Sequence, residues 1–400
     1  MSNLPGKRIV LGVSGGIAAY KAVELASRLV QARAHVDVVM TEAAREFVAP
    51  LTFQTITKHP VHGPVFEGWS EQARGHVSLA EEADALVVAP ATANTIAKLA
   101  LGLADDMLSV THLAATPRGI PFVVAPAMEP HMFQHVATQS HLATLRSRGA
   151  QIVGPAHGRL ASGAVGLGRM SPPEEIVAAL DLALGAAGAL SGRRIVVSAG
   201  GTQEALDPVR VLTNRSSGKM GYAIAQASLH AGADVTLIST PTGLPVPFGA
   251  KLVPVVSALD LLSAVEQHVS GADALIMAAA VADYRPATTA DHKIKKHDGP
   301  MTVELVRNPD ILATVATPGT LRVGFAAETQ DIERNARDKL QRKNLDMIVA
   351  NDARLAMGSD DNAVTIYFRD GRLLEVPTAH KDVVATRIVE AIAELLEPRG

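Results

Sequence analysis

A segment that occurs twice constrains the fold of this chain more than any other feature. Gly-Lys-Arg-Ile-Val at residues 6–10 continues as an apolar run into a turn of small residues at 14–16. Gly-Arg-Arg-Ile-Val at residues 192–196 leads in the same way to glycines at 200–201. After the first turn, apolar residues recur with helical spacing to about residue 33. A strand, a glycine turn and a helix form a β-turn-α unit, so the sequence predicts two α/β domains.

The first half reads as a parallel sheet. Its apolar runs alternate with helical stretches, as in sheets that helices cover on both faces. The runs lie at residues 8–13, 35–40, 85–89 and 121–125. Small residues with little patterning at 182–189 then interrupt the alternation. We therefore expect a flavodoxin-like or Rossmann-like domain over residues 1–189.

The second half, residues 190–400, predicts a Rossmann-like domain with a mixed sheet. Its strand-like runs lie at residues 235–238, 274–277, 322–325 and 347–349. Near the end, Asp370-Gly371 stands between apolar runs at 363–368 and 372–376. An Asp-Gly turn between two such runs is typical of an antiparallel hairpin.

Composition excludes several classes of protein. The 400 residues suit two domains, and the net charge of -3 gives no global attraction to nucleic acid or anionic lipid. The absence of cysteine excludes disulfides, thiolate metal sites and a cysteine nucleophile. No apolar run reaches membrane-spanning length, and the first residues lack the pattern of a signal peptide. We expect a cytoplasmic protein that binds neither membranes nor nucleic acid.

Two polar blocks follow predicted strands of the first domain. The turn Ser14-Gly15-Gly16 exposes N–H groups at the start of a helix, where a phosphate binds well; alternatively, the glycines only permit close packing. The block at residues 90–95 places hydroxyls and an amide at the carboxyl end of a strand, where α/β sheets bind ligands. Its alternative interpretation is a helix N-cap at Thr92 or Asn94.

The candidate metal ligands of this half are weak. Asp105 and Asp106 have no nearby His or Glu to complete a site, so we interpret them as a polar loop. His131 and His135 have helical spacing but no third ligand, which favours a helix surface. His76 is a candidate acid–base group, although most isolated histidines are structural. We predict no metal bound by protein side chains.

The second half contains a polar turn and a basic run. The turn at residues 214–221 resembles a P-loop but has Thr213 and Met220 where that motif requires Gly and Ser/Thr. It can still bind phosphate through its N–H groups. The run Lys293-Ile294-Lys295-Lys296 is by itself most simply a solvated loop.

The order of blocks in the first half resembles the flavin-containing cysteine decarboxylase family. These blocks lie at residues 12–21, 90–94, 102–109, 126–132 and 163–170. The whole chain is similar to the bifunctional family that joins such a decarboxylase to a phosphopantothenate–cysteine ligase. The resemblance implies FMN as cofactor, which oxidises the substrate thiol so that CO2 leaves easily.

The same resemblance implies roles for individual residues. The cofactor-binding residues it implies are Ser14, Gly15, Gly16, Thr41, Pro90, Ala91, Thr92, Asn94 and Ser109. Met128, Gly163, Arg169 and Met170 would bind substrate, and His76, Glu129 and Ser162 occupy catalytic positions.

Two of these positions depart from the family pattern. Glu129 stands where the family usually has Asn, and a carboxylate there repels the substrate carboxylate unless it is protonated. Ser162 stands where the flap commonly has Cys, and a hydroxyl is a far weaker acid than a thiol. Four outcomes stay open: decarboxylation is slow, it stops at the enethiol, it uses another proton donor, or the two residues have simply changed in a half that still works.

The second half is similar to the ligase of that family. Its blocks lie at residues 198–202, 207–210, 214–221, 278–284, 293–296, 308–311 and 324–329. The resemblance implies that phosphopantothenate attacks CTP to give an acyl-cytidylate, from which the cysteine amine displaces CMP. Mg²⁺ would accompany the triphosphate.

Here too the resemblance implies residue roles. Asn214 and Lys293 would act on the acyl-cytidylate, and Arg210 would bind substrate. The nucleotide-binding residues it implies are Gly200, Gly201, Ala279, Asp283, Asn308, Pro309, Asp310, Ile311, Phe325, Lys339 and Lys343.

The function implied by the whole chain is therefore ligation of 4'-phosphopantothenate to cysteine, followed by decarboxylation to 4'-phosphopantetheine. The family also implies a homo-oligomer with trimeric decarboxylase units and ligase dimers, up to a dodecamer. Two alternatives stay open: an active ligase whose flavin domain serves mainly as an assembly scaffold, and a regulatory flavoprotein.

Overall fold

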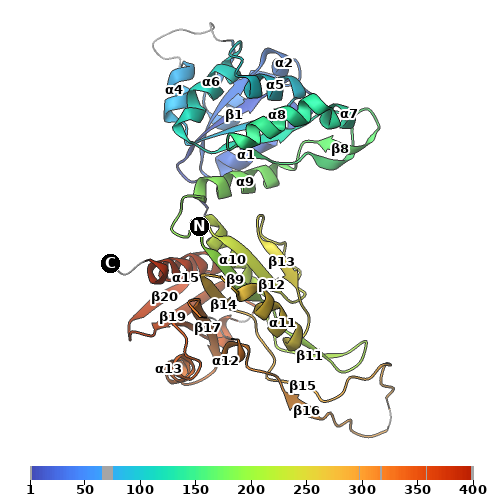
Figure 1. Ribbon diagram of the computed structural model, residues 1–400, viewed down its shortest axis with the longest axis vertical. Helices are drawn as coiled ribbons and strands as arrows, with labels where there is room; N and C mark the ends of the chain where they lie inside the picture. The colour runs from blue at the N-terminus through green and yellow to red at the C-terminus, as the bar shows by residue number, and fades with distance from the viewer. Residues whose placement is uncertain (1, 65–74, 297, 316–317, 357, 398–400) are drawn as a thin grey trace. The chain divides into compact units, whose positions relative to one another are not determined.

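The computed structural model describes residues 2–64, 75–296, 298–315, 318–356 and 358–397. The chain divides into two compact units, Ser2–Gly185 and Ala186–Gly400 (Figure 1). The division falls inside the small-residue segment that the sequence singles out. Among the described residues, no helix is both long and apolar enough to cross a membrane.

The first unit is built on a six-stranded parallel sheet with strand order β3-β2-β1-β4-β5-β6. Its strands are β1 (Arg8–Val13), β2 (His35–Met40), β3 (Val61–His62), β4 (Ala85–Ala91), β5 (Phe122–Pro126) and β6 (Gln151–Ile152). The parallel α/β sheet predicted from the apolar runs is confirmed. A separate antiparallel hairpin pairs β7 (Ala156–Arg159) with β8 (Val165–Arg169).

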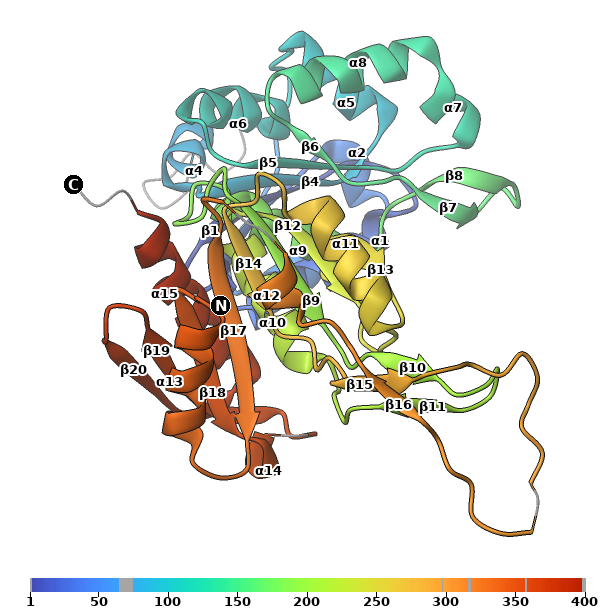
Figure 2. The same cartoon turned by 60° about the horizontal axis from the view of Figure 1, so that its bottom comes forward.

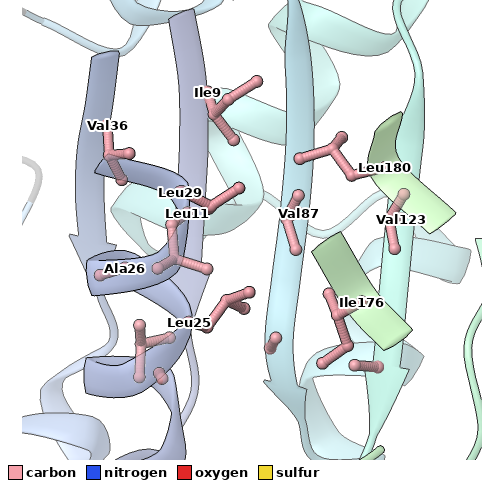
Figure 3. Close-up of a cluster of buried hydrophobic side chains, with 14 of the residues drawn as sticks. Ile9, Leu11, Leu25, Ala26, Leu29, Val36, Val87, Val123, Ile176 and Leu180 are labelled. Carbon is pink, nitrogen blue, oxygen red and sulfur yellow. The ribbon is translucent and has the colours of Figure 1, made fainter. Parts of the chain in front are cut away.

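Helices cover both faces of this sheet. They are α1 (Ala19–Gln31), α2 (Glu42–Arg45), α3 (Pro50–Thr57), α4 (His76–Glu82), α5 (Ala93–Leu101), α6 (Met107–Ala115), α7 (Pro130–Gln134), α8 (Val136–Ser147) and α9 (Pro173–Gly185). Alternate residues of β1 enter different cores, because successive side chains of a strand point to opposite faces. Figure 3 shows Ile9 and Leu11 in the core formed with α1 and α9, whereas Val10 packs into the core on the other face.

The second unit contains an eight-stranded sheet with strand order β13-β12-β9-β14-β17-β18-β19-β20. Its strands are β9 (Arg194–Ala199), β12 (Asp234–Ser239), β13 (Lys251–Pro254), β14 (Ala274–Met277), β17 (Leu321–Glu328), β18 (Met347–Asp352), β19 (Asp361–Phe368) and β20 (Leu373–His380). The last two are antiparallel to their neighbours and the others are parallel, so the predicted mixed sheet is confirmed. Gly371 supplies the turn between β19 and β20 with a φ of 91°.

The remaining elements of this unit surround the sheet. The helices are α10 (Lys219–His230), α11 (Ala258–Val269), α12 (Ile311–Thr314), α13 (Ile332–Arg342), α14 (Ala353–Ala356) and α15 (Lys381–Leu396). Two short hairpins lie together at one end of the unit (Figure 2): β10 (Gln203–Ala205) with β11 (Val211–Thr213), and β15 (Tyr284–Pro286) with β16 (Leu305–Arg307).

The stability of the first unit depends on pH through one buried histidine. His112 lies on α6 with only 5% of its surface exposed, its ring packs against Phe122, and its Nδ1 atom has no hydrogen-bond partner among the described residues. Burial, with a smaller contribution from the Arg148 charge, lowers the pKa of His112 from 6.5 to about 4. The folded unit therefore holds this ring neutral over a range in which the unfolded chain protonates it.

We expect the first unit to lose stability as the pH falls from 6.5 toward 4, because only the unfolded chain binds the His112 proton there. The loss from this group between pH 7.5 and pH 5 is about 2 kcal/mol. His112→Phe keeps the ring but cannot titrate. Urea unfolding at both pH values, followed by hydrogen exchange in peptides covering α6, measures the difference. An equal loss in wild type and variant contradicts the prediction.

Candidate functional site

In the first unit, polar residues gather at the carboxyl ends of β1, β2 and β4. Ser14 is fully buried, and its hydroxyl donates to the Pro90 carbonyl at 2.7 Å and accepts from the Thr92 N–H at 3.0 Å. This side chain therefore fastens the turn after β1 to the turn after β4. The sequence predicted Ser14 as a cofactor ligand; its hydroxyl is already used within the protein, which leaves the backbone of the turn to bind a ligand.

The two glycines after Ser14 have different environments. A Cβ on Gly15 would overlap Ala43 of α2, whereas one on Gly16 would lie 3.5 Å from Thr92 Cγ2. Among the described residues, no acceptor takes up the N–H groups of Gly15 and Gly16. Free N–H groups just before α1 fit the phosphate of a cofactor.

The neighbouring predicted residues form helix starts around this turn. Thr41 caps α2 by accepting from Ala44 N–H, and Thr92 caps α5 by accepting from Thr95 N–H, so the N-cap interpretation holds for Thr92. Pro90 and Ala91 are buried, and Asn94 is exposed at the start of α5.

The acidic loop before α6 is held by its own chain. Ser109 forms a capping box with Asp106, and Lys98 Nζ lies 2.8 Å from Asp105 and 2.9 Å from Asp106. The interpretation of these aspartates as a polar loop agrees with these contacts. No group of three or more potential metal-ligating side chains occurs in the part of the chain that the structure describes.

The hairpin β7–β8 brings the two unusual residues of the sequence together. Ser162 lies in the turn of the hairpin, where its hydroxyl donates a hydrogen bond to Glu129 Oε1. The loop before α7 is joined to β8 because Met128 N–H donates to the Gly168 carbonyl at 3.0 Å. The turn that carries Ser162 also contains Gly163, which has a φ of 89°.

Other predicted residues of this unit lie apart from that contact. Met170 is buried in the core, and Arg169 is exposed and crosses Gly158 of β7. His76 is the first residue of α4 and is half-buried. His135 caps α8, where its ring accepts from Ala137 N–H at 3.2 Å.

The second unit contains a pocket of about 1170 Å³ at the carboxyl end of its parallel strands. Ten residues predicted from the resemblance line it: Asn214, Ala279, Asp283, Asn308, Pro309, Asp310, Ile311, Phe325, Lys339 and Lys343. They come from separate stretches of the chain that the sheet brings to one edge. Such an edge is where open α/β sheets bind ligands.

Side-chain amides hold one wall of this pocket. Asn214 Nδ2 donates to the Val281 carbonyl at 3.1 Å, and Asn308 Nδ2 donates to the Ala282 carbonyl at 2.8 Å. The backbone N–H of Asn308 also donates to the Asp283 carbonyl at 2.8 Å. The loop after β14 is thus fixed from both sides.

Two lysines supply positive charge to the pocket. Lys339 Nζ donates to the Phe325 carbonyl at 2.6 Å, and Lys343 Nζ lies 2.8 Å from the Asp310 carboxylate. Burial lowers the pKa of Lys339, and the neighbouring Lys343 lowers it further. Cations in a pocket stabilise the negative charge of phosphoryl groups.

Four residues predicted for this site are not among those that line the pocket. Gly200 and Gly201 lie behind it: the Gly200 carbonyl accepts from Ala280 N–H at 2.8 Å, and a Cβ on Gly201 would lie 2.8 Å from the Asn214 carbonyl. Arg210 binds Asp207, and Lys293 is exposed in the segment after β15.

The pocket also contains residues that the sequence did not single out. Lys219 begins α10 and pairs with Asp360 at 2.6 Å; it lies within the turn at residues 214–221 that resembles a P-loop, so its position was a usable signal. Lys381 is 6% exposed and donates to the Ser359 carbonyl. Nothing in the sequence around Lys381 indicates its burial, which depends on the packing of α15 against the sheet.

Comparisons with known proteins cover both units. The flavoprotein family model matches residues 1–185, and the model for the DNA/pantothenate metabolism flavoprotein C-terminal domain matches residues 190–396. The coenzyme A biosynthesis bifunctional protein CoaBC of Vibrio cholerae is 48% identical over 402 residues, which cover 98% of this chain and 100% of that protein. The protein of the same name from Bacillus subtilis is 48% identical over 405 residues, 99% of each chain.

A solved structure is also similar. The crystal structure of the C-terminal domain of a CoaBC protein is 44% identical and covers 52% of this chain and 98% of its own, with a TM-score of 0.46.

Proposed function

The chain belongs to the family of bifunctional coenzyme A biosynthesis proteins, and from that premise we propose that its second unit joins 4'-phosphopantothenate to cysteine and its first unit decarboxylates the product. The two activities are those of a phosphopantothenoylcysteine synthetase and decarboxylase. We assign ligation to residues 190–400 and decarboxylation to residues 1–189.

The pocket of the second unit carries the ligase proposal. A carboxylate is a poor acyl donor, so the phosphopantothenate carboxylate attacks the α-phosphorus of CTP and pyrophosphate leaves. Lys339 and Lys343 neutralise the phosphates, and Asp283 contacts the nucleotide. The cysteine amine then attacks the acyl-cytidylate and CMP leaves. Asn214, fixed by its bond to Val281, orients the acyl group during this step. Mg²⁺ accompanies the triphosphate.

The turn after β1 supports FMN as the cofactor of the first unit. Gly15 and Gly16 offer free N–H groups to the FMN phosphate, with Thr41 and the start of α5 beside them. Bound FMN would supply the two-electron oxidation of the substrate thiol that allows the carboxylate to leave as CO2. His76 serves as the acid–base group, and the hairpin turn with Ser162 covers the substrate.

The Glu129–Ser162 contact supports a second, narrower function for this unit. Glu129 brings a carboxylate to the place where the substrate carboxylate would bind, and Ser162 replaces the acidic thiol of the family. A chain of this kind ligates efficiently while its flavin unit decarboxylates poorly and contributes mainly to a homo-oligomer of trimers and dimers.

One incubation tests the proposal. The full-length protein with FMN, CTP, Mg²⁺, 4'-phosphopantothenate and cysteine should release pyrophosphate and CMP in equal amounts, and mass spectrometry should detect phosphopantothenoylcysteine or its decarboxylated products. Omitting CTP should stop all of them. Pyrophosphate release that does not depend on phosphopantothenate, or none at all, contradicts the ligase assignment. Accumulation of phosphopantothenoylcysteine with little CO2 identifies the narrower function, whereas accumulation of the enethiol shows that CO2 is lost and that the final reduction fails.

A further inference from the structure

A buried carboxylate outside the pocket forms a hydrogen bond to the segment that carries Lys293. The side chain of Asp207 is completely buried. Its Oδ1 accepts from the N–H groups of Val209 at 2.8 Å and Arg210 at 2.9 Å. Its Oδ2 accepts from Arg210 Nε at 2.9 Å and from the Ile294 N–H at 3.1 Å. One carboxylate thus joins the turn between β10 and β11 to a residue more than eighty positions later in the chain.

Arg210 binds the other backbone group of Ile294, its carbonyl. Its Nη2 donates to Asp207 Oδ2 at 2.5 Å and to the Ile294 carbonyl at 2.8 Å. The N–H and the C=O of Ile294 are therefore both bound, one by the carboxylate and one by the guanidinium. We call Asp207 and Arg210 the clamp.

The clamp belongs to a longer contact between two segments. Ala290 N–H donates to the Leu206 carbonyl at 3.1 Å, and Thr289 Oγ1 donates to the Ala205 carbonyl at 3.2 Å. Residues 289–294 therefore run beside residues 205–210, in the region where Figure 2 shows β10 next to β15. Hydrogen bonds to residues 205–210 therefore fix the segment beyond β15 as far as Ile294.

Lys293 directly precedes the clamped residue and is itself exposed. Fixing a backbone residue costs conformational entropy. A lysine that has to reach a reacting group acts faster when its backbone is already fixed before substrate binds. The Arg210 hydrogen bonds, followed by those from backbone N–H groups, hold the pKa of Asp207 far below its ordinary value. The carboxylate therefore stays ionised at every pH at which such an enzyme works.

We propose that Asp207 is a positioning residue of the ligase reaction: through Ile294 it fixes the backbone from which Lys293 acts on the acyl-cytidylate. This inference rests on the proposed ligase function. Neither Asp207 nor Lys293 is among the residues that line the pocket, and the role of Lys293 is the one that the family resemblance implies. An effect of Asp207 on the reaction therefore passes through the segment that carries Lys293. The clamp also explains why Arg210 does not line the pocket: its guanidinium is bound to Asp207 and to the Ile294 carbonyl.

A double-mutant cycle in the full-length protein tests this. We expect Asp207→Asn to lower kcat for ligation by about 10²-fold, the order of magnitude that a misplacement of about 1 Å costs. The KM for CTP should change less than twofold, because the lysines that hold the nucleotide are elsewhere. Lys293→Ala should lower kcat similarly, and the double variant should be no slower than Lys293→Ala. Losses that multiply in the double variant overturn the proposal.

A matched control separates positioning from folding. Asp273 makes a similar set of contacts, with Arg193 Nη1 and Arg194 N–H each at 2.8 Å, directly before β14 of the eight-stranded sheet. We expect Asp273→Asn to leave kcat within twofold of wild type. Limited trypsin digestion without ligands should cut after Lys293 several-fold faster in Asp207→Asn than in Asp273→Asn. Equal cutting rates overturn the proposal.

A second variant covers the case in which Asp207→Asn folds poorly. Ile294→Pro removes the N–H from which Asp207 accepts but keeps the ion pair of Asp207 and Arg210, and it should lower kcat to the same extent. If wild type ligates and neither Ile294→Pro nor Lys293→Ala slows it, the clamp has no role in the reaction and the ligase function stands. If wild type releases no pyrophosphate from CTP and phosphopantothenate, the ligase function itself fails.

Discussion

Asn214→Asp should lower the rate of CTP-dependent amide formation by about 10²–10³-fold, the loss typical when one preorganised hydrogen-bond donor is removed from an active site. Asn214 lines the pocket and donates from Nδ2 to the Val281 carbonyl at 3.1 Å. A carboxylate cannot donate there and repels that carbonyl, so the wall formed by residues 278–283 is released. It also adds a negative charge to a pocket that has to receive a triphosphate.

Measurement of CMP and pyrophosphate release gives the size of this effect, and the two-unit architecture supplies an internal control. Decarboxylation of added phosphopantothenoylcysteine should be unchanged, because Asn214 belongs to the other unit. Asn344→Asp makes the same charge change at an exposed position outside the pocket and should ligate within twofold of wild type. Ligation by Asn214→Asp within threefold of Asn344→Asp contradicts the prediction.

The strands in the sheet interiors could be predicted because they are continuous apolar runs. The run at 274–277 matches β14, and the Asp-Gly turn placed the hairpin of β19 and β20. The sequence did not show that β17 continues to Glu328. Those last residues are less apolar, and they are extended because they pair with β18, for example Glu328 with Asp352. The edge strands β3 and β6 are only two residues long and carry no pattern to find.

The pocket of the second unit could be predicted where several consecutive residues line it, as residues 308–311 do. It could not be predicted where one side chain is recruited by packing. Lys381 is buried because α15 begins beside the pocket, and a lone lysine in a sequence carries no sign of this. The same holds for Arg210, whose partners Asp207 and Ile294 meet only because residues 289–294 lie against the turn after β10.

The contact between Glu129 and Ser162 has the same origin, since the two residues come from different loops and meet at the hairpin turn. We expect Ser162→Cys to raise the share of fully reduced product, 4'-phosphopantetheine, over enethiol by about 10²-fold, the lower range for a positioned general acid. A thiol has a pKa near 8.5 and gives up its proton far more readily than a hydroxyl. Combining it with Glu129→Asn should in addition raise total CO2 release, because the amide removes the charge that repels the substrate carboxylate.

Because the chain contains no cysteine, each variant has a single thiol, and any change in the products can be assigned to that thiol. Ser147→Cys places that thiol on the exposed end of α8 and serves as the matched control. The products formed from phosphopantothenoylcysteine are separated by mass spectrometry, with ligation measured in parallel as a check on folding. If Ser162→Cys and Ser147→Cys give the same product ratio as wild type, proton donation at the hairpin turn does not limit the reaction. The charge of Glu129 acts on the earlier step, so Glu129→Asn by itself should then still raise CO2 release.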